Sequence, residues 1–259
     1  MRFVFLIFLM SFLSACISSE TTTTLNNPQG LKVEFDPQIA AETRLKLALL
    51  YLENKQMQLA KENLDQAKQY QPNNAKVFHI FAYYYQQVNE DENAETYYKK
   101  SISVDADNGD TYHNYGTFLC AQARYKEADE LFLKAISLPH YNRVADTYTN
   151  AALCAQENKN YYKAIDYGEH ALSHNPKNID LNLFLAALNI TVKKYDAAMS
   201  YLINFQRISE PTAESLWQWV RLSYFDGNKS SLSKHGQQLL ELFPDTPQAI
   251  NYVNKKYDD

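Results

Sequence analysis

The chain has 259 residues, of which 46% are apolar and 14% aromatic, and its formal net charge is -5. Nucleic-acid binding needs clustered positive charge, so this slightly acidic balance excludes a nucleic-acid partner. There are 6 glycines and 8 prolines against 20 tyrosines, which favours helices joined by short turns over sheets.

The first fifteen residues have the composition of an export signal. Arg2 precedes the apolar run 3–13, which matches a signal-peptide core and is shorter than the ~20 residues of a membrane-spanning helix. The sequence LSAC at 13–16 resembles the lipobox of bacterial lipoproteins, in which cleavage makes the cysteine the first residue and acyl chains are attached to it. We therefore expect removal of residues 1–15 and lipidation of Cys16. The alternative is an ordinary signal peptide with a chance cysteine near its end.

The residues after Cys16 predict where the protein is held. Gram-negative sorting keeps lipoproteins with aspartate after the cysteine in the inner membrane, so Ile17 implies, by resemblance, the outer membrane. Two or more acyl chains, at ~0.8 kcal/mol per buried CH₂, hold a soluble domain on a bilayer. Residues 16–35 are rich in hydroxyl and amide side chains, which is typical of a flexible tether. We expect a lipid-anchored protein on the periplasmic face, with its folded part at 36–259.

Small-residue positions recur along the rest of the chain at a fixed interval. One series has spacings of 34, 34, 36, 34 and 34: Ala48, Ala82, Gly116, Ala152, Ala186 and Val220. Two further series, which begin at Ala60 and Ala67, repeat these intervals, including the single step of 36. Small side chains at such positions let two antiparallel helices and the next pair approach closely. A period of about 34 residues with this pattern is typical of tetratricopeptide repeats.

The period divides the chain into six expected helical hairpins and a closing helix. The expected repeats are 41–74, 75–108, 109–144, 145–178, 179–212 and 213–245, and the closing helix is 246–257. The two extra residues of the third repeat fall within 138–144. The sequence therefore predicts an all-α fold, a right-handed superhelical solenoid of tetratricopeptide (TPR) hairpins with a C-terminal capping helix. A set of unrelated helical hairpins is the alternative.

The chain lacks the residue patterns that are typical of catalysis or metal binding. His170 and His174 have the i, i+4 spacing of two zinc ligands, but the H-E-x-x-H order and a third ligand are missing. No glycine-rich loop could cradle a phosphate. We expect no enzymatic activity, no cofactor, no metal and no small-molecule substrate.

Cys120 and Cys154 occupy nearly equivalent places in the first helices of the third and fourth repeats. First helices of neighbouring hairpins lie side by side in a solenoid, and an exported protein meets oxidising surroundings. We therefore expect a disulfide between them. The alternative is two buried thiols that serve as small apolar residues.

First helices of successive hairpins line an inner face that can hold an extended peptide or a helix of another protein. Asn114 and Asn150 fall at the same place in consecutive repeats, where paired side-chain amides suit a peptide backbone. Polar residues that merely face solvent are the alternative. The expected partner-binding residues are Lys76, His79, Tyr83, His113, Asn114, Thr117, Thr149, Asn150 and Gln156, and the same face is expected to include Leu49, Leu183, Trp217 and Arg221.

Two cysteine-bearing segments are the most distinctive part of the chain: NYGTFLCAQARYKEADELFLKAI at 114–136 and NAALCA at 150–155. With the lipobox, the tether and six repeats, they resemble the type IV pilus biogenesis and stability lipoproteins of the PilF/PilW family. This resemblance implies a pilotin, which binds secretin subunits in the periplasm and promotes their outer-membrane localisation and multimerisation. Two further alternatives are a general periplasmic scaffold lipoprotein of another envelope assembly machine and an accessory subunit of a peptidoglycan-active complex.

Overall fold

The computed structural model describes residues 34–258, and this part of the chain contains thirteen helices and no strand. The expected signal peptide, Cys16, Ile17 and most of the tether lie outside the described residues. None of the described helices is long and apolar enough to cross a membrane. Residues 37–259 form one unit. Its helices are α1 (Pro37–Glu53), α2 (Met57–Tyr70), α3 (Ala75–Gln87), α4 (Asp91–Val104), α5 (Gly109–Ala121), α6 (Tyr125–Ser137), α7 (Val144–Glu157), α8 (Tyr161–His174), α9 (Asp180–Thr191), α10 (Tyr195–Gln206), α11 (Ala213–Phe225), α12 (Lys229–Leu242) and α13 (Pro247–Val253).

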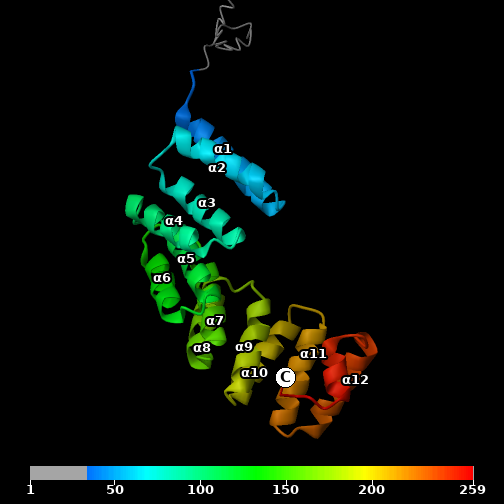
Figure 1. Cartoon of the computed structure of the whole chain (residues 1–259). Helices are drawn as coiled ribbons and strands as arrows, with labels where there is room; N and C mark the ends of the chain where they lie inside the picture. The colour runs from blue at the N-terminus through cyan, green and yellow to red at the C-terminus, as the bar shows by residue number, and fades with distance from the viewer. Residues whose placement is uncertain (1–33, 259) are drawn as a thin grey trace, which may run out of the picture. The chain divides into compact units, whose positions relative to one another are not determined.

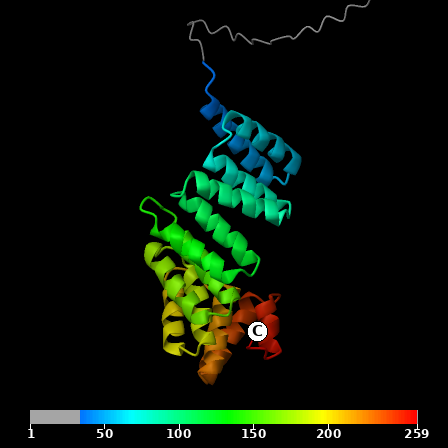
Figure 2. The same ribbon diagram turned by 60° about the vertical axis from the view of Figure 1, so that its left-hand side comes forward.

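Consecutive helices pair into six hairpins, from α1 with α2 to α11 with α12 (Figure 1). The second helix of each hairpin packs on the first helix of the next hairpin, and α13 closes the stack against α11 and α12. Figure 2 shows the same order of hairpins after a turn of 60°. The predicted all-α solenoid of tetratricopeptide hairpins is confirmed.

The turn inside each hairpin has the same backbone form. One residue in each takes a left-handed conformation with φ between 57° and 76°, and these residues share the period of the chain: Lys55, Asn89, Ala123, Lys159, Lys193 and Gly227. The following residue donates its N–H to the carbonyl five positions earlier, for example Gln56 to Tyr51 at 2.8 Å. Such a bond satisfies one of the carbonyls left free at the end of a helix and reverses the chain at once.

The small-residue positions are the points of closest helix approach. Ala48, Ala82, Ala152 and Ala186 are fully buried. At Gly116 an added Cβ would lie 2.9 Å from the Phe132 ring, so the ring of α6 rests directly on the backbone of α5. This contact explains why the chain has glycine where the other hairpins have alanine or valine.

The closing helix differs from its expected range of 246–257. Helix α13 ends at Val253, because Asn254 caps it and Lys255 takes a left-handed conformation with φ 55°. The chain then turns back, and the Tyr257 ring lies 4.4 Å from the ring of Tyr224 in α11. The last residues therefore cover the end of the core through a turn instead of a further helical turn.

The first helices do not all pack on one another in the same way. Contacts join α1 to α3, α3 to α5, α5 to α7 and α9 to α11. Helices α7 and α9, both fully described, have no such contact, and α8 packs on each of them. The row of first helices is therefore parted between the fourth and fifth hairpins.

Candidate protein-binding face

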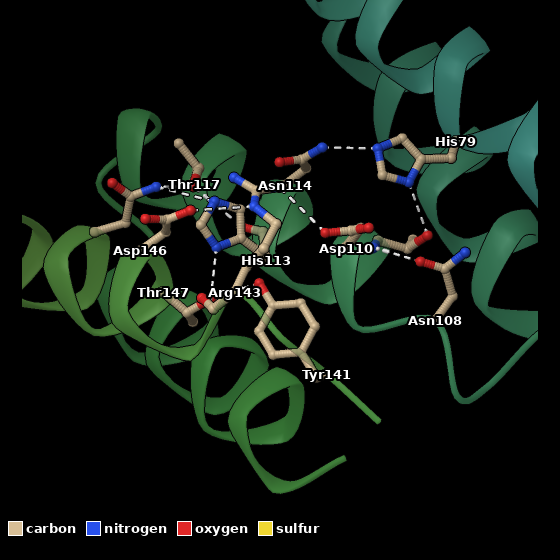
Figure 3. Close-up of polar contacts among 12 residues, drawn as sticks. His79, Asn108, Asp110, His113, Asn114, Thr117, Tyr141, Arg143, Asp146 and Thr147 are labelled. Carbon is tan, nitrogen blue, oxygen red and sulfur yellow. Dashed lines mark hydrogen bonds and ion pairs between the residues drawn. The ribbon is translucent and has the colours of Figure 1, made fainter. Parts of the chain in front are cut away.

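His79 connects the first helices α3 and α5. The side-chain amide of Asn114 donates to Nε2 of His79 at 2.7 Å, so the ring proton is on Nδ1, which donates to the hydroxyl of Thr111 at 2.9 Å. The Thr111 hydroxyl lies 3.0 Å from Oγ of Ser101, which donates to the Ala75 carbonyl at 2.9 Å. Each polar group in this buried chain thus has a partner. Figure 3 shows His79 and Asn114 at this junction.

The same arrangement repeats one hairpin later, where His113 connects α5 and α7 (Figure 3). Its Nδ1 lies 2.7 Å from the Thr147 hydroxyl, and Nδ2 of Asn150 donates to its Nε2 at 3.1 Å. Asn150 also donates to the Thr117 hydroxyl at 3.2 Å, and the Tyr141 hydroxyl lies 2.6 Å from that of Thr147. We call the two histidines, with Thr111, Asn114, Thr147 and Asn150, the polar ladder.

Both histidines of the polar ladder are neutral near pH 7. Burial lowers the pKa of His79 to about 4 and the pKa of His113 to about 4. A charged imidazole would lose its solvation, and its Nε2 could no longer accept the amide hydrogen from asparagine. The two rings are therefore struts between helices, with both nitrogens engaged.

The structure places the expected partner-binding residues in three environments. His113 is 3% exposed, so the sequence-based expectation of a groove-lining side chain does not describe its place, which is between α5 and α7. Asn114 and Asn150 are half-buried and direct their amide hydrogens to the histidines. Lys76 and Thr117 are exposed, and Tyr83, Thr149 and Gln156 are half-buried.

Cys120 in α5 and Cys154 in α7 are joined by a disulfide, with their Cα atoms 5.8 Å apart. Both residues are buried. The bond connects the same two helices that His113 connects. The third and fourth hairpins are thus held together by a covalent link and a polar one.

His170 and His174, the pair with metal-ligand spacing, both stack on one tyrosine. Their rings lie 4.9 and 5.8 Å from the ring of Tyr148. Within residues 34–258 no group of histidine, cysteine and carboxylate side chains is arranged to hold a metal ion.

An acidic residue occupies the same place at the start of four successive first helices: Asp110, Asp146, Asp180 and Glu214. We call this set the acid row. Arg143 lies between the first two members, with Nη1 3.1 Å from Asp110 and Nε 3.2 Å from Asp146 (Figure 3). Arg143 belongs to the segment 138–144, which contains the two extra residues of the third repeat. The longer step therefore places a cation between two carboxylates.

The other two members of the acid row have no such cation. Within the described part of the chain, no lysine, arginine or histidine forms an ion pair with Asp180 or Glu214. Glu214 accepts only neutral amide hydrogens, from Gln218 at 2.6 Å and Gln248 at 3.1 Å. Arg221 of α11 donates to Gln218 at 3.2 Å and acts on Glu214 through its charge, without a direct ion pair. Among the described residues, Asp180 and Glu214 thus lack the direct ion pair that Arg143 makes with Asp110 and Asp146.

Beside these two carboxylates the face becomes apolar. Leu183, Phe184 and Ala187 of α9 stand where α5 has His113, Asn114 and Thr117, and Leu153 of α7 is 44% exposed. Two adjoining pockets share Asp180 and Phe184. One, of about 480 Å³, is lined by Ile179, Asp180, Leu183, Phe184, Ala187, Phe205, Ser209, Thr212 and Glu214. The other, of about 200 Å³ between α7 and α9, is lined by Thr149, Leu153, Asn178, Asp180, Leu181 and Phe184.

These two pockets together are the apolar groove. Of its residues, the sequence analysis named Thr149 and Leu183 and missed Phe184, Leu153 and the two carboxylates. The two carboxylates could have been found from the repeat register, since residues 110, 146, 180 and 214 follow the common intervals of 36, 34 and 34. The sequence does not show that only Asp110 and Asp146 are paired with a cation, because this depends on the position of Arg143 in the loop before α7.

Sequence comparison relates the chain to one repeat family and to two bacterial proteins. Residues 41–74 and 75–108 match the tetratricopeptide repeat family. An uncharacterized protein of Haemophilus influenzae is 39% identical over 142 residues, which cover 55% of this chain and 73% of that protein. The type IV pilus assembly protein PilF of Pseudomonas aeruginosa is 28% identical over 240 residues, which cover 92% of this chain and 93% of PilF.

Solved structures with the same fold include two pilus proteins. The structure of P. aeruginosa PilF superposes with a TM-score of 0.71 at 26% identity, covering 85% of this chain and 99% of PilF. PilW, described as a widely conserved type IV pilus biogenesis factor, superposes with a TM-score of 0.69 at 21% identity, covering 82% of this chain and 98% of PilW. At that identity the PilW likeness concerns the fold alone.

Proposed function

We propose that this chain, a tetratricopeptide-repeat protein similar to PilF along most of its length, acts in type IV pilus biogenesis as a pilotin. In this role it is a lipoprotein of the outer membrane that binds secretin subunits in the periplasm. It promotes their localisation to the outer membrane and their assembly into multimers. The observation that carries the proposal is the 28% identity to PilF across 92% of this chain, because a match of that length includes every hairpin.

Two features of the chain support the two tasks of a pilotin, which are membrane attachment and recognition of another protein. The sequence LSAC at 13–16, followed by Ile17, supports a lipid anchor in the outer membrane. The hairpins at 37–242 present a row of first helices, which is the surface that helical repeat proteins use to bind other proteins. An anchor and a recognition surface on one chain suit a protein that brings another protein to a membrane.

Deletion of the gene tests the proposal. We expect heat-resistant secretin multimers to disappear from the outer-membrane fraction and twitching motility to be lost, with both restored by the gene on a plasmid. A second strain that expresses an unrelated outer-membrane lipoprotein from the same plasmid controls for expression. Normal amounts of secretin multimers in the outer membrane of the deletion strain would rule out the pilotin role and favour a scaffold for another envelope machine.

A further inference from the structure

The apolar groove is open because of how the hairpins follow one another. Between α5 and α7 the disulfide and the polar ladder fill the junction. Between α7 and α9 the backbones do not touch, and a pocket takes the place of a strut. Leu153 is 44% exposed at its edge, and Phe184 is half-buried between the two pockets. Apolar surface in a hollow of this kind gains from being covered by a partner.

The charged residues that line the apolar groove are both acidic. Asp180 borders both pockets and Glu214 borders the larger one, and neither forms an ion pair within residues 34–258. Arg143 shows what satisfies this position elsewhere in the acid row, where a guanidinium lies between the carboxylates of Asp110 and Asp146. Asp180 and Glu214 have no cation of residues 34–258 at ion-pair distance, because Gln218 stands between Arg221 and Glu214. A partner that brings one would complete the row by charge complementarity.

From this arrangement we propose that the apolar groove binds a short amphipathic segment of a partner protein, in which lysine or arginine flanks apolar side chains. The apolar side chains enter the two pockets on either side of Phe184, and the cations meet Asp180 and Glu214. The inference specifies the chemistry of the segment that a pilotin would recognise, and to that extent it rests on the proposed function.

Binding of designed peptides to the lipidated full-length mature protein in phosphatidylcholine nanodiscs tests the inference. Two fluorescent twelve-residue peptides have the same leucines but carry either two lysines or two glutamates at the same positions. We expect the lysine peptide to bind about tenfold more tightly than the glutamate peptide, and to weaken as salt is raised, because exposed charges are screened beyond ~10 Å at 0.1 M salt. Empty nanodiscs give the background.

Matched substitutions locate the binding. Combining Asp180→Asn with Glu214→Gln should weaken the lysine peptide about tenfold, and Leu153→Ser should weaken both peptides. Two controls should leave binding unchanged. Leu133→Ser removes a leucine of α6 that is also 44% exposed, and Asp110→Asn changes an acid-row member already paired with Arg143. Circular dichroism checks that each variant keeps its helix content.

Three results would overturn the inference. The glutamate peptide could bind as tightly as the lysine peptide, or the groove variants could bind like wild type. Sedimentation could show a dimer of the wild-type chain that Leu153→Ser dissociates, in which case a second copy occupies the groove.

The same variants in the deletion strain separate the groove inference from the proposed pilotin function. Groove variants that lose the peptide while secretin multimers form without any copy of the gene would disprove the pilotin role alone. Variants that bind no less peptide, in a strain whose multimers depend on the gene, would disprove the groove assignment alone.

Discussion

His79 and His113 each make two hydrogen bonds to the first helix of the next hairpin. In each ring one nitrogen accepts from an asparagine amide and the other donates to a threonine hydroxyl. Leaving one such buried partner unsatisfied costs about 1–3 kcal/mol, so each ring restrains both neighbours. This bonding pattern requires the neutral imidazole.

Acid should therefore weaken the fold through these two residues. The folded pKa of each ring is about 4, whereas the unfolded chain titrates near 6.5. Between these values the unfolded chain binds more protons, so stability falls as pH drops from about 6.5 to about 4, by about 3 kcal/mol per histidine. Urea unfolding followed by circular dichroism at several pH values should show this slope.

A double variant, His79→Gln with His113→Gln, isolates the histidine contribution from that of the carboxylates. Glutamine does not titrate, so the variant should be less stable at pH 7 but lose less stability on acidification. An equal loss in wild type and variant over this pH range would show that the histidines do not titrate as the structure implies.

The sequence showed that His79 and His113 are equivalent positions, but not which way their side chains face. The 34-residue spacing of His79 and His113 marks equivalent positions, but a polar side chain there can face either a partner or the next hairpin. In the structure both histidines face the next hairpin, because the hydroxyls of Thr111 and Thr147 lie within hydrogen-bond distance once the hairpins are stacked. The orientation of these side chains therefore depends on contacts between repeats, which the sequence spacing does not show.

The six hairpin turns depend on left-handed residues, five of which are not glycine. A side chain in this conformation costs roughly 1–2 kcal/mol because Cβ approaches the following carbonyl. The sequence signal for such a turn is usually glycine, and here only Gly227 provides it. Short turns between the helices were expected from the composition, whereas their left-handed conformation was not.

Ala123→Gly should therefore stabilise the protein. Ala123 has φ 58° in the turn between α5 and α6, where glycine avoids the strain, although glycine also gives the unfolded chain more freedom. We expect a net gain of about 0.5–1 kcal/mol in the free energy of unfolding. Ala121→Gly, at the last residue of α5, is the matched control and should cost about 0.5–1 kcal/mol. A loss of stability for Ala123→Gly as large as that of the control would contradict the assigned turn.

The stack of hairpins was predictable because its cause is local and repeated. Small residues at fixed intervals let each pair of helices close, and the interval itself revealed the insertion in the third repeat. The parting of α7 from α9 has no comparable signal, since the 34-residue step between them is the regular one. The apolar groove thus could not be located before the structure.

For the whole molecule, the proposed role requires that recognition and membrane attachment act together. Folded hairpins alone would capture a partner anywhere in the periplasm, whereas an anchored chain concentrates it at one membrane. Ile17, which follows the proposed lipidation site Cys16, provides a way to separate the two properties, because it lies 20 residues before the first helix at Pro37.

Ile17→Asp should move the protein to the inner membrane while leaving the hairpins folded. By resemblance to Gram-negative lipoprotein sorting, aspartate after Cys16 retains the protein there. Density-gradient separation of membranes and immunoblotting should show the shift, together with fewer secretin multimers in the outer membrane. Ile17→Ser should stay in the outer membrane, and Cys16→Ser should abolish lipid attachment. Outer-membrane recovery of the aspartate variant would refute the assigned sorting signal.

The parting of α7 from α9 also bears on how the protein handles a client. Helix α8 packs on both α7 and α9, whereas the backbones of α7 and α9 make no contact, so the width of the apolar groove is set through α8. A substitution in α8 that alters this packing would therefore widen or narrow the groove while the disulfide between α5 and α7 and the packing of α9 on α11 remain in place. Related proteins with the same hairpins would in this way accept partner segments of different size.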